Sequence, residues 1–398
     1  MFKAKINCFM AKILLLNGES VQVVCMAHAL HKLGHEVSSL GYTRCSSGYA
    51  TRWVDHKFKC PEPIAYPEEF RKFFYEHIKD HKYDLIIPML DEGAEFLSRE
   101  KYTIEESGVR VAIECYETFQ KANNKQRLME LCKENNIPHP RTDELTIDNL
   151  KKAADYVGFP AMIKPNISAG AKGIVKVDNI QELKEKFPKI ESHFGPCTLQ
   201  QYVEQPGYYY NVMLYRDHKG VYPAYTIIKI RRYFPLKGGS SCYCETVEHD
   251  ALLLSCKVLL EKLNWRGFAD IDVLEDKHTG ELKIIEINPR TPSSLQASFA
   301  AGVNFAEIFV EDYLTPIVNH KKYPYISGKQ VRWFGLDVMW FLFSKDRFRF
   351  KPSWFNFWGK QVSYHDGSWD DPLPMLAGIL AGVAKYLNPE FRKAKLNK

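Results

Sequence analysis

The segment 267–290 constrains this chain more than any other. Two runs of alternating polar and apolar residues flank a turn at residues 277–280, and this pattern predicts a β-hairpin. Because side chains two residues apart in a strand share a face, the second strand should be polar on one face and apolar on the other. The polar face would carry Glu286, Asn288 and Arg290, and the opposite face Ile285 and Ile287.

The same hairpin should bring acidic side chains together across its two strands. Asp270 and Asp272 share a face of the first strand, and a hairpin symmetric about Thr279 places Asp272 directly across from Glu286. Carboxylates about 5 Å apart repel one another. Hard oxygen ligands of this kind suit Mg²⁺. The alternative is a solvated polar face, with Pro289 simply ending the strand.

A second group of residues surrounds Lys164, which an apolar strand delivers. A loop of small residues follows, and a further strand begins at Ile174. Glycines allow backbone N–H groups to approach phosphate oxygens closely, and lysines supply positive charge. The alternative is an ordinary glycine-rich turn with solvated lysines. The residues of this loop are Ser168, Ala169, Gly170, Lys172 and Gly173.

Two further elements carry a weaker signal. Lys125 opens a predicted helix over residues 125–134, and an apolar strand around residues 199–203 leads into an extended linker. Such a linker can offer backbone groups to the edge of an adenine. On their own, a solvent-facing lysine and a plain core strand are the simpler interpretations.

Residues 1–120 alternate short apolar runs with helical patterns. We expect strands at residues 12–16, 36–40, 84–88 and 109–113, and helices at residues 20–33, 68–81 and 92–98. This βαβ rhythm predicts a parallel, doubly wound sheet, which binds ligands at the carboxyl ends of its strands. Residues 17–20 and 89–92 lie at two such ends. No GxGxxG motif follows the first strand, so we discard a dehydrogenase interpretation.

Charge and cysteine usage narrow the class of protein. A formal charge of +6 over 398 residues suits anionic small molecules and is too weak to indicate nucleic acid. Ten cysteines are scattered without a CxxC pair, which predicts a reduced, cytoplasmic protein. The apolar run at residues 13–16 is too short for a signal peptide, and no run reaches the ~18–20 residues that span a bilayer.

In this order and spacing, the two lysine elements, the hinge strand and the acidic hairpin resemble the ATP-grasp superfamily. The likeness is greatest to the ATP-binding halves of the carbamoyl-phosphate synthetase large subunit and to related carboxylate–amine ligases, and it covers about residues 1–317. It implies a mixed α/β and α+β fold. A pre-ATP-grasp α/β domain would occupy residues 1–120. An ATP-grasp domain of two α+β subdomains would occupy residues 121–320, with a lid at about 125–200, before an aromatic-rich extension at 321–398.

The resemblance also implies a role for each matching residue. Lys125 and Lys164 would contact the phosphates of ATP beneath a mobile loop at residues 168–173, and Arg290 would stabilise the transferring phosphoryl group. The hinge residues at the adenine would be Gln200, Gln201, Tyr202, Val203 and Glu204. Two Mg²⁺ ions, for which Mn²⁺ can substitute, would be held by Asp272, Glu286 and Asn288, with Glu286 bridging.

The chain departs from the family where the ribose would bind. The family often has a glutamate a few residues past the hinge. Aligning the chain on Asn211 puts Tyr209 at that position, which leaves Glu204 as a substitute.

Two short segments are candidates for binding a carboxylate substrate. Arg231 and Arg232 are neighbouring arginines, and arginine binds carboxylates bidentately. The alternative is a basic surface hairpin. Ser293 and Ser294 follow the acidic strand and would line the same pocket, or would merely cap the next helix.

These roles imply an ATP-dependent ligase that converts a carboxylate into an acyl phosphate and transfers it to an amine, releasing ADP and phosphate. A kinase of the same fold and a non-catalytic nucleotide-binding protein are the alternatives. The partners would be small-molecule carboxylates and amines, and a homodimer is common for this fold. No catalytic nucleophile from the protein is required.

The last seventy residues differ from the rest of the chain. They hold five of the seven tryptophans and a basic–aromatic stretch at residues 347–351. Such stretches dock at membrane interfaces in some proteins. We favour an aromatic core packed on the ligase domain over membrane association.

Overall fold

The chain begins with an α/β domain whose sheet is entirely parallel. In the computed structural model, which describes residues 10–168, 172–236, 238–315, 323 and 325–387, this sheet has the strand order β3-β2-β1-β4-β5. Its strands are β1 (Lys12–Leu16), β2 (Glu36–Gly41), β3 (His56–Lys59), β4 (Leu85–Pro88) and β5 (Arg110–Val111). Its helices are α1 (Gln22–Lys32), α2 (Ser47–Ala50), α3 (Pro67–His81), α4 (Asp91–Glu106) and α5 (Tyr116–Asn123).

Burial on both faces explains why the inner strands β1 and β4 are almost wholly apolar. Ile13 and Leu15 of β1 belong to a core that includes α1, whereas Leu14 and Leu16 face the core beneath α3 and α4. The predicted parallel sheet is confirmed. The polar strand β3 and the one-turn helix α2 were not predicted, and α4 is longer than the expected segment 92–98.

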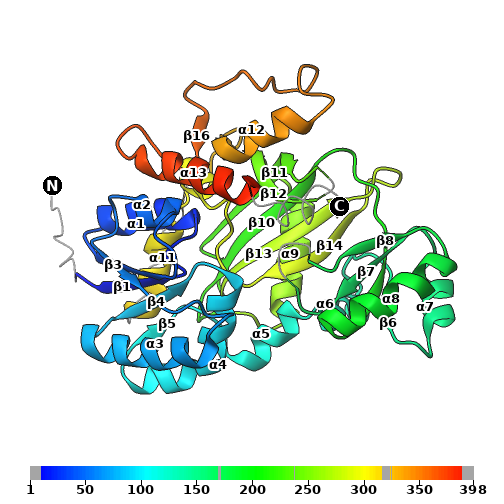
Figure 1. Cartoon of the computed structure of the whole chain (residues 1–398), viewed down its shortest axis with the longest axis horizontal. Helices are drawn as coiled ribbons and strands as arrows, with labels where there is room; N and C mark the ends of the chain where they lie inside the picture. The colour runs from blue at the N-terminus through cyan, green and yellow to red at the C-terminus, as the bar shows by residue number, and fades with distance from the viewer. Residues whose placement is uncertain (1–9, 169–171, 237, 316–322, 324, 388–398) are drawn as a thin grey trace.

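A small four-stranded antiparallel sheet forms the next layer, in the order β6-β9-β7-β8. Its strands are β6 (Thr142–Leu145), β7 (Ala161–Pro165), β8 (Val175–Val177) and β9 (Cys197–Gln201). The accompanying helices are α6 (Lys125–Glu134), α7 (Leu150–Val157) and α8 (Ile180–Phe194). This unit, which we call the lid, lies to one side of the molecule (Figure 1). Its strands pack with α7 and α8 in an apolar core of their own, whereas the buried apolar residues of α6 join the core of the central sheet.

A seven-stranded sheet forms the centre of the molecule, in the order β14-β13-β10-β11-β12-β15-β16. Its strands are β10 (Tyr209–Arg216), β11 (Ala224–Phe234), β12 (Ser240–Thr246), β13 (Gly267–Glu275), β14 (Leu282–Asn288), β15 (Gln330–Arg332) and β16 (Val362–Tyr364). One face packs on α9 (Asp250–Lys262). The other face meets the N-terminal domain, with α10 (Gln296–Ala300) and α11 (Phe305–Leu314) between them.

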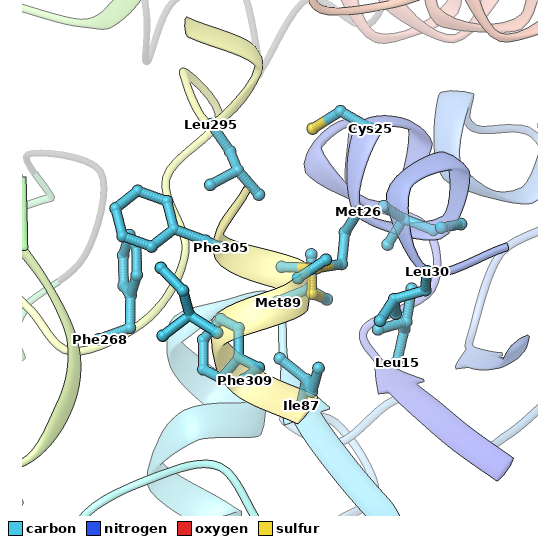
Figure 2. Packing of buried hydrophobic residues seen from close by; sticks show 14 of the residues in the cluster. Leu15, Cys25, Met26, Leu30, Ile87, Met89, Phe268, Leu295, Phe305 and Phe309 are labelled. Carbon is cyan, nitrogen blue, oxygen red and sulfur yellow. The ribbon is translucent and has the colours of Figure 1, made fainter. Parts of the chain in front are cut away.

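Figure 2 shows how this second face is joined to the N-terminal domain. Phe268 of β13 contacts Phe305 and Phe309 of α11 through edge and stacked ring contacts. These rings belong to the same buried cluster as Leu15 and Ile87 of the parallel sheet. The α/β domain and the central sheet therefore share one continuous apolar core.

The C-terminal segment extends the central sheet and then crosses to the N-terminal domain. It contributes β15, β16, α12 (Phe334–Phe343) and α13 (Leu373–Leu387). Trp340 and Trp354 pack in an aromatic cluster, as predicted, whereas Trp358 and Trp369 are exposed. Within the described part of the chain, no helix combines the length and apolar character needed to cross a bilayer.

Candidate active site

Around its carboxylates, the acidic hairpin has the predicted register. Asp272 pairs with Glu286 and Asp270 pairs with Asn288 across β13 and β14. A bulge next to these pairs shifts the register toward the turn. As a result the prediction that Ile285 and Ile287 share the apolar face is wrong: Ile284 and Ile287 enter the core, and Ile285 does not.

The two aspartates of β13 lie where a negative charge is unfavourable. Burial raises the pKa of Asp270 to about 7, although Arg290 opposes this. Burial, the Asp270 charge and the Glu286 charge raise the pKa of Asp272 well above its usual value. Asn211 of β10 donates a hydrogen bond of 2.9 Å to Asp272. The negative charge of both aspartates is therefore unfavourable unless a further cation lies beside them.

Glu286 differs from the aspartates because two lysines face it. Its burial alone would raise its pKa, but Lys125 and Lys164 outweigh that effect and lower the pKa. The Lys125 ammonium lies 3.6 Å from Oε2 of Glu286 and donates to the carbonyl of Ser168 at 3.1 Å. Burial, with Lys125 acting in the same direction, lowers the pKa of Lys164 to about 8. The lid thus delivers two ammonium groups to the carboxylates of the central sheet.

Arg290 connects this cluster to the N-terminal domain. Its Nε donates to Asp91 at 2.9 Å, and its Nη2 donates to Oδ1 of Asn288 at 3.3 Å. Its Nη1 lies 3.8 Å from Asp270. Asp91 is the first residue of α4, directly after β4. The sequence marks that strand end as a ligand-binding edge but does not show its pairing with a residue 199 positions away.

The carboxyl ends of β1 and β4 meet beside Arg290. Burial raises the pKa of Glu19 to about 7, and the charge of Glu92 acts in the same direction. Asn17, at the end of β1, adopts a positive φ of 67°. A side chain at Gly93 would place its Cβ 2.0 Å from Oδ1 of Asn17, so glycine is required for this close approach. Both predicted ligand-binding edges therefore adjoin the acidic hairpin.

The predicted phosphate loop is only partly within the described residues, because Ala169 and Gly170 fall outside them. Ser168 is placed beside Lys125 by the hydrogen bond given above. Gly173 has a φ of +72°, and a Cβ there would lie 2.7 Å from the ring of Phe194. Burial raises the pKa of Glu92, and the positive charges of Arg290 and Lys172 oppose this.

The hinge follows β9 and lies between the lid and the hairpin turn. Gln200 is buried and donates to Thr142, whereas Oε1 of Gln201 accepts from the backbone of Arg141. The backbone N–H of Tyr202 donates to Pro160, and Val203 is buried. The Glu204 carboxylate is held by Lys277 at 2.7 Å and His278 at 3.1 Å.

Tyr209 lies on the same face as the carboxylates. Its hydroxyl donates to the carbonyl of Gly239 at 3.2 Å, and its ring contacts that of Tyr233. Burial, reinforced by the Asp272 charge, holds its pKa well above the usual value. The phenol is therefore neutral beside the acidic hairpin.

The structure does not bring the two candidate substrate arginines to this site. Lys229, Arg231 and Glu245 share the opposite face of the sheet, where Arg231 pairs with Glu245 through Nε at 2.7 Å. The Arg232 guanidinium is buried and bonded to both oxygens of Asp337. Strand alternation puts Arg231 on the face of Lys229, and a bulge next to it turns Arg232 onto the face of Tyr243. Their role as carboxylate ligands stays a prediction.

The serines after β14 follow Arg290 in the chain, after Thr291 and Pro292. Ser294 is buried and Ser293 is partly exposed, and both precede α10. The preceding residue Thr291 accepts a hydrogen bond of 3.2 Å from Gln22 of α1. This segment therefore runs along the junction of the two domains.

The donor set fits a divalent cation. Asp270, Asp272 and Glu286 supply carboxylates, Asn288 adds an amide, and hard oxygen ligands of this type suit Mg²⁺. Among the described residues, no three His, Cys, Asp or Glu side chains already form a complete ion cage. Mg²⁺ sites built from one or two carboxylates together with substrate phosphates need no such cage.

Comparison with known proteins gives this geometry a family context. Residues 122–294 match a family model described as an ATP-grasp domain. The D-aspartate ligase of Enterococcus faecium is 25% identical over 285 residues, which cover 66% of this chain and 67% of that protein. The carbamoyl phosphate synthase large chain of Thermoanaerobacter sp. is 25% identical over 214 residues, and the matched region spans only 20% of its length.

Solved structures show the same fold. The biotin carboxylase domain of the Hydrogenobacter thermophilus 2-oxoglutarate carboxylase, solved with MgADP and bicarbonate, superposes with a TM-score of 0.65 at 14% identity. The match covers 81% of this chain and 74% of that one. The predicted fold class, with an α/β domain followed by two further α+β layers, is confirmed.

Proposed function

The chain carries an ATP-grasp domain, and from this premise we propose that it is an ATP-dependent carboxylate–amine ligase. One observation carries the proposal: Glu286 stands between two lysines of the lid and two aspartates of the central sheet. Catalysis of phosphoryl transfer depends on positioning and on neutralising charge. This arrangement offers cations for phosphate oxygens and oxygen ligands for metal ions in one place.

We assign nucleotide binding to the side of the lid that faces the carboxylates of the central sheet. Lys125 and Lys164 would contact the phosphates, with Ser168 and the following loop above them. The adenine would lie against the hinge, where Val203 offers its backbone. Asp272, Glu286 and Asn288 would hold Mg²⁺, and we extend this set to Asp270. When bound, two Mg²⁺ or Mn²⁺ ions would offset the charge of the phosphate oxygens.

The remaining residues of the site would act on the substrates. Arg290 would stabilise the γ-phosphoryl group as a substrate carboxylate attacks it and ADP leaves. The product is an acyl phosphate, and an amine then displaces phosphate to form an amide. Positively charged groups already in place at the reacting centre lower the barrier without reorganisation. Exclusion of water by the lid would protect the acyl phosphate from hydrolysis.

Amino acids or their derivatives are the substrates that we favour. The reason is the similarity to a D-aspartate ligase over two thirds of both chains. The competing function is that of a kinase, in which the phosphoryl group remains on the acceptor. A ligase releases phosphate only when both a carboxylate and an amine are present, whereas a kinase needs no amine.

The test is phosphate release by Glu286→Gln with Mg-ATP and a library of carboxylates and amines. We expect a loss of at least about a hundredfold, because removing one charge-stabilising group typically costs 10²–10³ in rate. Glu281→Gln is the matched control, since Glu281 is an exposed residue of the same hairpin. Full activity of Glu286→Gln would overturn the assignment of the metal site.

A further inference from the structure

The segment 342–360, from the end of α12 to just before β16, exposes an unusual amount of apolar surface. It projects from the edge of the molecule beyond α12 (Figure 1). Five large apolar side chains are each between 46% and 74% exposed: Leu342, Phe343, Phe348, Phe355 and Trp358. A cluster of large exposed apolar side chains usually marks a surface that contacts a partner.

The exposed rings form one patch. Phe348 and Phe355 stack with their centroids 6.5 Å apart, and Phe341 lies 5.5 Å and 5.8 Å from them. Phe357 continues the contacts, 6.4 Å from Phe355 and 5.6 Å from Trp358. The partly buried rings form a floor beneath the exposed ones, so the patch is held in place.

Basic side chains surround this patch. Residues 345–360 contain five basic residues and a single acidic one, whereas the whole chain has 54 basic and 48 acidic residues. Arg347 caps α12 through the carbonyl of Leu342 at 3.1 Å and lies 5.5 Å from the ring of Phe348. The other four are exposed and form no ion pair with any described residue: Lys345, Arg349, Lys351 and Lys360.

We infer that the segment 342–360 docks the protein on the surface of an anionic lipid bilayer. Phe and Trp side chains insert at the level of the lipid headgroups, and Lys and Arg are attracted to anionic lipids. This segment supplies both kinds of group on one surface. The phosphate groups of anionic lipids would supply the negative charge that these unpaired cations lack.

The same charges argue against a second copy of the chain as the occupant. Two copies joined through this patch would bring like charges face to face, and such an arrangement opposes association. A bilayer with acidic headgroups presents the opposite sign. The inference does not depend on the proposed ligase activity, because no residue of the candidate active site contributes to the patch.

The segment is also anchored firmly enough to transmit such docking to the rest of the molecule. Arg232 of β11 donates to the carbonyl of Pro352 at 3.2 Å, and Arg332 of β15 donates to that of Asn356 at 2.9 Å. Both arginines are bonded to Asp337 of α12. The patch is therefore tied to two strands of the central sheet.

The experiment is flotation of the full-length protein with lipid vesicles. We expect the protein to float with vesicles that contain phosphatidylglycerol and to remain behind with vesicles of phosphatidylcholine alone. Added salt should release it, because exposed charges are screened within about 3 Å at 1 M ionic strength. Failure to float with the anionic vesicles would overturn the inference.

Variants locate the docking surface. We expect a loss of at least about tenfold in vesicle binding from the triple variant Phe348→Ser/Phe355→Ser/Trp358→Ser. A similar loss is expected from the charge variant Lys345→Gln/Arg349→Gln/Lys351→Gln/Lys360→Gln. All these side chains are exposed, so circular dichroism and thermal unfolding should match those of the unmodified protein.

Two controls change exposed apolar groups that lie outside the segment 342–360. Trp369 is 94% exposed and precedes two aspartates, and Leu376 and Leu380 are exposed on α13. Trp369→Ser and Leu376→Ser/Leu380→Ser should keep full vesicle binding. Loss of binding in these controls but not in the triple variant would refute the assignment. Sedimentation showing a dimer that the triple variant dissociates would replace the bilayer with a second copy.

Discussion

The ammonium group of Lys164 is buried near a second ammonium, that of Lys125. This costs free energy, because burial disfavours the charged form and like charges repel. Glu286 and Asp272 partly compensate. A bound polyphosphate would compensate the two positive charges further. The unfavourable position of Lys164 therefore favours a role in binding an anion.

Replacing Lys164 with Met should therefore impair turnover more than folding. We expect a loss on the order of a hundredfold in kcat/KM for ATP, while the removal of an unfavourably buried charge leaves thermal stability similar or higher. Steady-state kinetics and thermal unfolding measure the two effects. Lys189→Met is the control, because Lys189 on α8 of the lid is exposed and pairs with the equally exposed Glu185. Equal losses in both variants would show that Lys164 has no special role.

The residues of the site differ in how well the sequence predicts them. The pairing of Asp272 with Glu286 follows from local alternation and a short turn, so it could be predicted. The contacts of Asp272 with Asn211 and of Arg290 with Asp91 join residues 61 and 199 positions apart. They depend on how separate elements pack, which a single sequence does not show. A bulge in β11 likewise cannot be seen in the sequence, and it decides the face on which Arg232 lies.

At the scale of elements, α12 is held to the central sheet by a buried group of charges. Arg232 donates to Asp337 at 2.7 Å and 2.8 Å, and Arg332 donates to the same carboxylate through Nε at 2.9 Å. All three side chains are fully buried. Aromatic rings cover the guanidinium groups, with Tyr243 4.2 Å from that of Arg232. Two buried cations thus depend on one anion.

Changing Asp337 to Asn should destabilise the protein strongly. Removing one partner of a buried ion pair leaves uncompensated charge and costs about 3–5 kcal/mol, and here two arginines lose their partner. Denaturant unfolding should show this loss. Asp346→Asn, in the exposed segment after α12, should change the stability by less than about 0.5 kcal/mol. If Asp337→Asn matched that control, the charge cluster would not be what holds α12.

The elements themselves were predicted where a strong pattern existed. The strands β1 and β4 are continuous apolar runs, and α6 was predicted with the bounds Lys125–Glu134 that the structure has. The strand β3 reads His-Lys-Phe-Lys and lies at the edge of its sheet, so neither burial nor alternation marks it. The strands β15 and β16 are three residues long and form only by adding to an existing sheet.

At the scale of the whole molecule, three parts meet at the candidate site. Lys125 joins the lid to the central sheet through Glu286, and Arg290 joins that sheet to the N-terminal domain through Asp91. The C-terminal segment adds a second link, because Ser47 of α2 donates to the carbonyl of Pro374 at 2.9 Å. A ligand bound at the junction would therefore stabilise the parts together rather than one of them.

Mg-ATP should accordingly raise the unfolding temperature of the whole chain in a single transition. A ligand at a hundred times its Kd adds ~2.7 kcal/mol to the free energy of unfolding, which differential scanning calorimetry resolves. Because Mg²⁺ would bridge the hairpin carboxylates and the phosphates, EDTA should remove most of the shift produced by ATP. In Glu286→Gln, ATP should raise the unfolding temperature only by the small amount that remains after EDTA, whether or not EDTA is present. If ATP raised the unfolding temperature equally with and without Mg²⁺, the carboxylates of β13 and β14 would not hold a metal. Two separate transitions would mean that the three parts do not unfold as a unit.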